Sequence, residues 1–196
     1  MIRIVGGRWR GRAVESPEGR GTTRPTTDRT RERVASMVLS ARGLDLEGCS
    51  VLDAFAGSGA VGLELLSRGA ARATFVDSDR WAVARVRRSA ASLGAAPGEV
   101  VALAGDVLAL APHGLAGAPF DVVFLDPPYA TDAGRVGALV GALASTGQLA
   151  PGAVVVYEHA AGTPGLDVAV LAPARSKTHG STTVDLLTYE GEGTPQ

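Results

Sequence analysis

Four consecutive residues, Asp126-Pro127-Pro128-Tyr129, place a carboxylate, two prolines and an aromatic ring directly after the apolar run 122–125. The run is typical of a buried strand, and the prolines cannot continue a sheet because each has a fixed φ and no N–H donor. In open α/β sheets, ligands bind beyond the carboxyl ends of the strands. This motif is therefore a candidate acceptor site, where an acid and backbone carbonyls hold an N–H₂ group and a ring stacks on a planar substrate.

A glycine-rich loop follows another apolar run, predicted as a strand over residues 51–55. Gly57, Gly59 and Gly62 satisfy G-x-G-x-x-G, a pattern that lets a strand-to-helix turn tighten and the backbone approach a ligand. Asp77 ends the next predicted strand, where a carboxylate can accept hydrogen bonds from the ribose of a nucleotide. Strand, loop, helix and acid in this order predict a nucleotide-type cofactor. The candidate cofactor-binding residues are Asp53, Phe55, Gly57, Ser58, Gly59, Asp77 and Asp106.

Acidic residues at the predicted strand ends indicate which cofactor this is. A dinucleotide brings a pyrophosphate, which the N-terminus of a helix neutralises and a nearby carboxylate repels. S-adenosylmethionine has no phosphate and carries a cationic amino-acid end, which the opposite charge of Asp53 would stabilise. Asp106 follows the third predicted strand and suits the exocyclic amine of adenine, although an acid at this position is also a candidate helix N-cap. The pattern favours S-adenosylmethionine over a nicotinamide dinucleotide.

With a methyl donor, the Asp-Pro-Pro-Tyr motif suits methylation of an amine on a base. The lone pair of such an amine is delocalised into the ring, so the amine is a poor nucleophile. Hydrogen bonds from the N–H₂ group to the Asp126 carboxylate and the Pro127 carbonyl would favour a more pyramidal nitrogen and hold it in line with the methyl group. Tyr129 would stack on the base, which must leave its helix or loop stack to reach the site.

The composition fits a soluble globular chain whose charge is strongly segregated. Of the 196 residues 45% are hydrophobic, and no run approaches the ~20 apolar residues that span a membrane. Cys49 is the only cysteine, and the three histidines show no ligand spacing, which favours a reducing cytoplasm and no metal. Residues 1–42 hold ten arginines against four acidic residues, whereas the rest of the chain is net acidic. This segregation predicts a basic arm for a polyanion joined to a non-basic body.

Hydrophobic periodicity predicts an α/β fold with extensions at both ends. Residues 1–42 are expected to form a hairpin (strands at 2–5 and 13–15), an arm and a helix over 28–41. Residues 43–190 are expected to form a doubly wound parallel sheet with an antiparallel edge, and residues 191–196 a frayed tail. The predicted strands are 51–55, 73–77, 99–104, 121–125 and 153–157, and the predicted helices are 59–68, 79–93, 107–110 and 133–145. A terminal hairpin is predicted from 166–171 and 182–189, bridged by 173–181.

Four segments in this order carry a family resemblance: 3–12 (RIVGGRWRGR), 24–29 (RPTTDR), 55–59 (FAGSG) and 126–129 (DPPY). They closely resemble the RsmD-type bacterial 16S ribosomal RNA guanine 2-amino methyltransferases. The resemblance implies a class I methyltransferase fold with S-adenosylmethionine as donor. It also implies a guanine of small-subunit ribosomal RNA as acceptor, presented on an assembled or partly assembled 30S subunit. A cytoplasmic monomer that binds neither a membrane nor a metal is the expected form.

The basic arm supplies the candidate RNA contacts, which are Arg8, Arg10, Arg12, Arg24, Arg29 and Arg31. Some of these arginines could instead form local salt bridges with Asp28 or Glu32, and Trp9 could stack on a base or pack the hairpin onto the domain. Three other functions stay open at this point. They are amino-methylation of adenine or cytosine in DNA, a non-catalytic RNA-binding role in ribosome assembly, and, least favoured, a nicotinamide oxidoreductase.

Overall fold

A central sheet organises the computed structural model, which describes residues 2–16, 28–128 and 130–191. Its seven strands lie in the order β5-β4-β3-β6-β7-β9-β8. Five strands are parallel to one another, and β9 runs antiparallel to β7 and to β8. The strands are β3 (Ser50–Asp53), β4 (Arg72–Asp77), β5 (Val100–Ala104), β6 (Phe120–Leu125), β7 (Leu149–Ala160), β8 (Leu171–His179) and β9 (Thr182–Tyr189).

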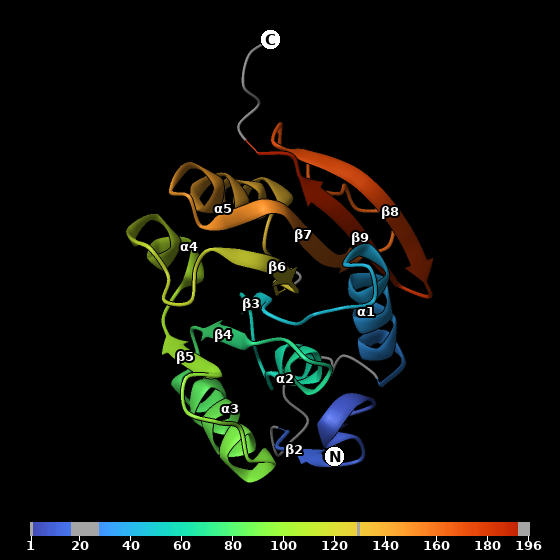
Figure 1. Ribbon diagram of the computed structural model, residues 1–196. Helices are drawn as coiled ribbons and strands as arrows, with labels where there is room; N and C mark the ends of the chain where they lie inside the picture. The colour runs from blue at the N-terminus through green and yellow to red at the C-terminus, as the bar shows by residue number, and fades with distance from the viewer. Residues whose placement is uncertain (1, 17–27, 129, 192–196) are drawn as a thin grey trace.

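Helices cover both faces of the sheet (Figure 1). One buried hydrophobic cluster joins the sheet to α1 (Asp28–Ala41), α2 (Ala60–Ser67) and α3 (Arg80–Leu93). A second cluster joins the other face to α4 (Val107–Leu110) and α5 (Ala133–Ser145), with the 3₁₀ turn Ala111–His113 beside α4. The predicted α/β class and all five of these helices are confirmed. No described helix is long and apolar enough to cross a membrane.

The N-terminal segment folds onto the face that carries α1, α2 and α3. Strand β1 (Ile2–Arg3) pairs antiparallel with β2 (Ala13–Val14), as the sequence predicts, and a 3₁₀ turn (Gly7–Trp9) lies between them. Ile2, Ile4, Trp9 and Val14 belong to the same hydrophobic cluster as the sheet. The boundary drawn after residue 42 from composition therefore falls inside one continuous core.

The predicted C-terminal hairpin is correct for β9 but wrong for its partner. Residues 166–170 form no strand, and β8 occupies most of the predicted bridge 173–181. Leu166, Val168 and Val170 alternate because they cover the second hydrophobic cluster from a loop. Strand β8 lies at the edge of the sheet, and after its first residues its side chains are exposed. It therefore lacks the hydrophobic alternation that would have predicted it.

Candidate active site at the carboxyl ends of the strands

Parallel pairing brings the predicted acidic residues to one edge of the sheet. Asp53 ends β3 and Asp77 ends β4, while Asp106 follows β5 and Asp126 follows β6. These four strands are neighbours in the sheet, so their carboxyl ends lie side by side. The spacing along the chain predicts this edge correctly, since each acid lies at the end of its strand or within two residues after it.

The glycine loop between β3 and α2 is tied to the end of β4 by Asp77. The Gly57 N–H donates to Asp77 Oδ2 over 2.7 Å, and the Asp79 N–H donates to Asp77 Oδ1 over 2.8 Å. Gly57 and Gly59 have φ angles of +53° and +71°, a region that favours glycine. A Cβ added at Gly57 would meet nothing within 4 Å, so the turn presents open space there. Phe55 and Ser58 are half-buried in the same loop.

Asp53 is the most perturbed carboxyl group of this edge. It is 1% exposed, and its Oδ2 accepts a hydrogen bond of 3.1 Å from the Gly62 N–H. Burial raises the pKa of Asp53 to about 8; the hydrogen bond from Gly62 opposes the shift, whereas the charges of Asp126 and Asp77 add to it. The buried carboxyl is therefore suited to releasing its proton when a cation arrives.

Gly62 allows this approach between α2 and the sheet. A Cβ at this position would lie 2.4 Å from Phe75 Cε1 and 3.2 Å from Asp53 Oδ2. The first distance is far below van der Waals contact, so a side chain would push α2 off β4 and off Asp53. The third glycine of the motif thus serves close helix-strand packing.

Asp106 is exposed and caps α4, with its Oδ1 accepting a 3.0 Å hydrogen bond from the Leu108 N–H. The capping interpretation considered from the sequence therefore holds, and a contact of Asp106 with adenine stays a prediction. Asp79 caps α3 in the same way, by accepting a 2.8 Å hydrogen bond from the Trp81 N–H.

A cavity of about 230 Å³ opens beside Asp126, Pro127 and Pro128. Its far wall comes from the end of β7 and the loop that follows, and it includes Glu158 and His159. No Lys or Arg is among the described residues that line it. Tyr129, predicted to stack on the substrate, lies outside the described residues.

Hydrogen bonds hold His159 rigidly in the wall of this cavity. Its Nε2 lies 3.0 Å from Asp185 Oδ2, and its Nδ1 lies 3.0 Å from Thr163 Oγ1. The ring also stacks on Tyr157, with 4.8 Å between ring centroids and 16° between planes. No ligand role is predicted for this histidine from its spacing, and in the structure these contacts make it part of the scaffold.

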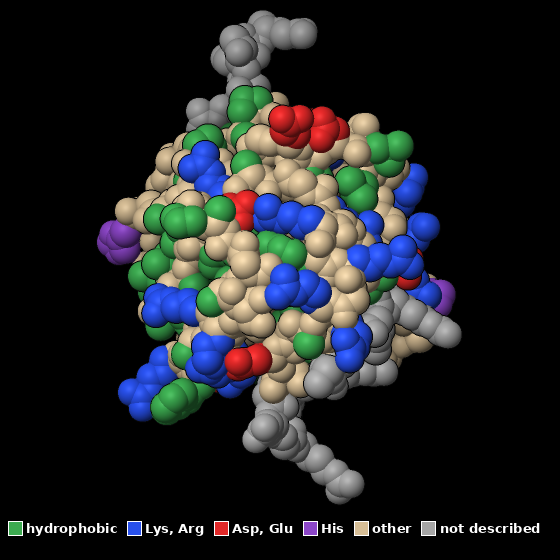
Figure 2. Space-filling view, turned by 60° about the horizontal axis from the view of Figure 1, so that its bottom comes forward, with side chains coloured by type: hydrophobic (Ala, Val, Ile, Leu, Met, Phe, Trp, Pro, Cys, Tyr) green, Lys and Arg blue, Asp and Glu red, His purple; other side chains and the backbone are tan. Residues whose placement is uncertain are grey.

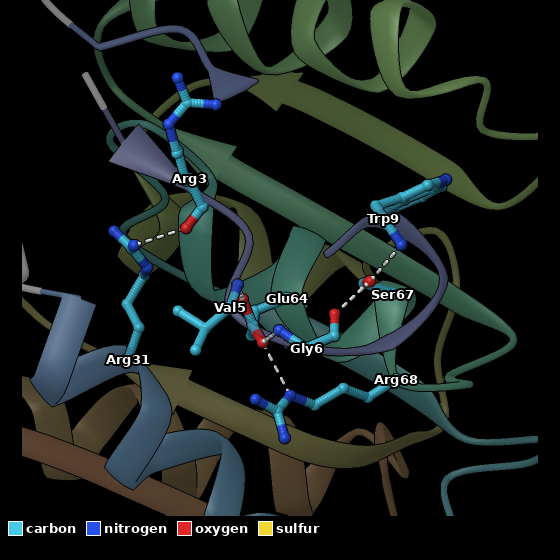
Figure 3. A network of polar contacts seen from close by, with 8 residues as sticks. All are labelled: Arg3, Val5, Gly6, Trp9, Arg31, Glu64, Ser67 and Arg68. Carbon is cyan, nitrogen blue, oxygen red and sulfur yellow. Dashed lines mark hydrogen bonds and ion pairs between the residues drawn. The ribbon is translucent and has the colours of Figure 1, made fainter. Parts of the chain in front are cut away.

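Helix α2 holds the N-terminal segment through two polar side chains (Figure 3). The Glu64 carboxylate, 1% exposed, accepts hydrogen bonds from the Val5 N–H (2.7 Å) and the Gly6 N–H (2.8 Å). It also accepts one of 2.7 Å from Arg68 Nε. Ser67 Oγ accepts from the Trp9 N–H (2.9 Å) and donates to the Gly6 carbonyl (2.6 Å). The sequence marks Glu64, Ser67 and Arg68 only as part of the family resemblance, and their role was missed because nothing local to α2 indicates which segment it will contact.

Several candidate RNA-binding arginines fix this segment to the domain. Arg8 pairs with Glu99 (2.8 Å) and stacks over the ring of Trp9, with its guanidinium carbon 4.3 Å from the ring centroid. Arg12 donates to the Leu93 carbonyl over 2.8 Å. Trp9 is buried, so the packing interpretation is the correct one.

Arg31 requires a correction. It is 1% exposed and donates to the Arg3 carbonyl over 2.8 Å, which makes it an interior residue that joins α1 to β1 (Figure 3). A buried guanidinium of this kind cannot contact an RNA phosphate, so the prediction for Arg31 is wrong. Arg10 is exposed, as that role requires, whereas Arg24 and the side chain of Arg29 lie outside the described residues.

The strand order, the glycine loop after β3 and the Asp-Pro-Pro turn after β6 define a class I S-adenosylmethionine-dependent methyltransferase fold. The magnesium protoporphyrin IX methyltransferase of Synechocystis PCC 6803, solved with bound SAM, shares this fold with a TM-score of 0.62 at 19% identity, covering 82% of this chain and 78% of that one. The yhhF protein of Escherichia coli matches with a TM-score of 0.81 at 32% identity, covering 97% of this chain and 99% of that one.

Comparison of sequences identifies the family within this class. The family model described as Conserved hypothetical protein 95 matches residues 2–188. The ribosomal RNA small subunit methyltransferase D of Escherichia coli K12 is 37% identical over 158 residues, which cover 81% of this chain and 74% of that protein. The chain belongs to this family, and the resemblance drawn from its motifs is confirmed.

Proposed function

We propose that this protein transfers a methyl group from S-adenosylmethionine to the exocyclic 2-amino group of a guanine in 16S ribosomal RNA. The observation that carries the proposal is the cavity beside Asp126-Pro127-Pro128 in a chain of this family. A cavity lined by carboxylates, with no described Lys or Arg, suits an uncharged base rather than a phosphate.

The residues at the strand ends fit the cofactor. S-adenosylmethionine, when bound, supplies a methyl group already activated on a sulfonium. The acids Asp53, Asp77 and Asp126 together favour a cationic nucleoside over a pyrophosphate. Asp53 would stabilise the cationic end of the cofactor, and Asp77 would both shape the glycine loop and accept hydrogen bonds from the ribose.

Asp126 and the Pro127 carbonyl would bind and orient the amine. Hydrogen bonds from both N–H groups keep the nitrogen lone pair directed at the methyl group, and the two prolines fix the turn that presents these acceptors. Guanine also has an N1–H donor, which suits the Glu158 carboxylate in the cavity wall. Adenine has an acceptor at its N1 instead, and a carboxylate there would repel it. The acidic wall therefore supports guanine as the acceptor.

The family supports ribosomal RNA as the substrate, because the Escherichia coli relative is named for the small ribosomal subunit RNA. We propose a 30S subunit or an assembly intermediate as the form that presents the base, and a cytoplasmic monomer as the active protein. A sequence-specific DNA methyltransferase would usually have a separate target-recognition region, whereas residues 2–188 match a single family model. A purely binding role would not need the Asp-Pro-Pro turn.

The test is to incubate the protein with labelled S-adenosylmethionine and, separately, naked 16S rRNA, 30S particles and duplex DNA, and then to map the methylated base. We expect label on the 2-amino group of a guanine in rRNA. Asp126→Ala should abolish transfer and leave cofactor affinity within about threefold, whereas Asp167→Ala, which removes an exposed loop carboxylate, should be fully active. Label confined to DNA, or full activity of Asp126→Ala, would refute the proposal.

A further inference from the structure

Helix α3 carries a second concentration of positive charge, separate from the N-terminal segment. Its fourteen residues include Arg80, Arg85, Arg87 and Arg88 and no acidic residue. The chain outside residues 1–42 is otherwise net acidic, so this helix departs from its surroundings. Figure 2 turns the lower part of Figure 1, where α3 and β2 lie, toward the viewer, and it shows many Lys and Arg side chains with few acidic ones between them.

Trp81 is the second unusual feature of this helix. It is 62% exposed, although α3 buries its other large apolar side chains, Val83, Val86 and Leu93. The guanidinium carbon of Arg80 lies 5.2 Å from the centroid of the Trp81 ring. An exposed aromatic ring beside arginines contributes nothing visible to the core, and it offers a flat face to a ligand.

Trp81, Arg85 and Arg88 lie on one side of α3, at spacings of four and three residues, and they line a groove of about 700 Å³. Residues 13–16 of the N-terminal segment form its other wall. We call this feature the α3 groove.

The walls of the α3 groove are well fixed. The Glu15 N–H donates to Ser89 Oγ over 3.0 Å, and the Asp79 cap holds the helix end that carries Trp81. A bound segment would therefore meet a preformed surface.

Arg88 is the arginine of the α3 groove that is available to an anion. Arg88 pairs with Glu15 at 2.8 Å, but more than half of the Arg88 side chain is exposed and this pair lies at the surface. Arg88 makes three hydrogen bonds of 2.8–3.1 Å to the two Glu15 oxygens, but solvent and salt screen an exposed pair, so a phosphate can compete with the carboxylate for the guanidinium. Arg85 contacts Asp79 at 3.4 Å, and most of its side chain is buried, so it adds positive charge to the groove wall rather than an exposed contact.

We propose that the α3 groove binds single-stranded RNA next to the target guanine, with Trp81 stacking on a flanking base and Arg88 contacting a phosphate. The position of Trp81 supports this role, because it lies four residues after Asp77, at the edge of the sheet where the methyl group is transferred. Stacking on an aromatic ring tolerates every base, since each base has a π-face. This inference rests on the proposed function, because it requires an RNA substrate.

The experiment measures affinity for a short labelled single-stranded RNA and steady-state methylation of the rRNA substrate. Trp81→Ala should weaken RNA binding about 5- to 100-fold, which is the range for loss of one stacked base, and Trp81→Phe should restore most of the affinity. The KM for RNA should rise, while kcat and the affinity for S-adenosylmethionine stay unchanged. Arg88→Gln should lower the slope of log affinity against log salt by about one. Addition of RNA should quench the emission of Trp81 in a Trp9→Phe background.

Leu44→Ala is the matched control, because Leu44 is the other large apolar side chain that is exposed in the described part of the chain. It should leave RNA affinity unchanged. The inference fails if the wild type methylates RNA and Trp81→Ala binds RNA equally well. It also fails if Trp81→Ala loses activity only on 30S particles, since the groove would then contact protein. A wild type that methylates no RNA would instead refute the proposed function.

Discussion

Asp53 should make the stability of the cofactor-free protein fall as the pH rises from about 5 to about 8. Its carboxyl group is buried at the end of β3, and burial raises its pKa to about 8, against an ordinary value of 3.8. Between these two values the folded protein binds a proton that the unfolded chain has released. The free energy of unfolding therefore decreases with pH throughout this window. The contribution of Asp53 to the free energy of unfolding is fully present below its ordinary pKa of 3.8. It is lost as the pH rises through the pKa of about 8 that the group has in the folded protein.

Asp53→Asn isolates this contribution. The amide oxygen can still accept the hydrogen bond from the Gly62 N–H, while the group can no longer ionise. Each unit of pH inside the window changes the free energy of unfolding by about 1.4 kcal/mol for one proton. Between about pH 5.5 and about pH 7.5 the wild type should lose about 2 to 3 kcal/mol relative to the variant. For a chain of this length that difference is about 5–10 °C in Tm.

Chemical denaturation of the cofactor-free proteins at a series of pH values measures the effect. Subtracting the variant curve from the wild-type curve removes the contributions of all other groups. Asp106→Asn is the control, because it changes an exposed carboxylate at the same edge of the sheet, and the loss of stability due to Asp53 between about pH 5.5 and about pH 7.5 should persist in it. A wild-type curve parallel to that of Asp53→Asn would refute the reasoning, since it would mean that Asp53 is ionised at neutral pH.

Three further effects are expected from the contacts of Asp53, Glu64 and Gly62. Binding of S-adenosylmethionine at pH 7 should release protons, detected by calorimetry in buffers of different ionisation enthalpy, and Asp53→Asn should abolish the release. Glu64→Gln should lower the free energy of unfolding by about 2–4 kcal/mol, because a single amide oxygen replaces a carboxylate that accepts hydrogen bonds from three donors. In a Trp81→Phe background it should also shift the emission of Trp9 to the red. Unchanged emission would contradict the role of Glu64 in anchoring the N-terminal segment. Gly62→Ala should cost about 1–3 kcal/mol and weaken cofactor binding, whereas Gly141→Ala, where a Cβ meets nothing within 4 Å in α5, should be neutral or stabilising.

Sequence reasoning predicted the elements whose pattern is local. Strands and helices of the α/β core carry their own periodicity, and the strand-end acids follow because parallel strands share an edge. Gly62, the third glycine of the motif, was also predicted from its local spacing. Only the structure shows why glycine is needed there, which is the close packing against Phe75. The β8 strand was missed because an exposed edge strand has no hydrophobic alternation to read.

The positions of the arginines could not be predicted, because a side chain on a charged segment does not reveal its partner. Arg31 satisfies a carbonyl in the interior, and Arg12 satisfies one at the end of α3, although the sequence presents both as part of a basic arm. The carbonyl that each arginine binds belongs to a segment far from that arginine in the sequence. Net charge counted along the chain therefore overestimates how many of these arginines face solvent.

The same contacts explain how a partly neutralised arm can still belong to the face that we propose binds RNA. By docking through Glu64 and Ser67, the N-terminal segment comes to lie against α3, which contributes four arginines and no acid from the acidic part of the chain. The wall formed by residues 13–16 then completes the α3 groove beside Trp81. Local charge on a folded surface, rather than charge along the sequence, decides where a polyanion is held. In this chain Arg8, Arg12 and Arg31 build the surface, whereas Arg88 of α3 keeps an exposed guanidinium for the proposed phosphate contact.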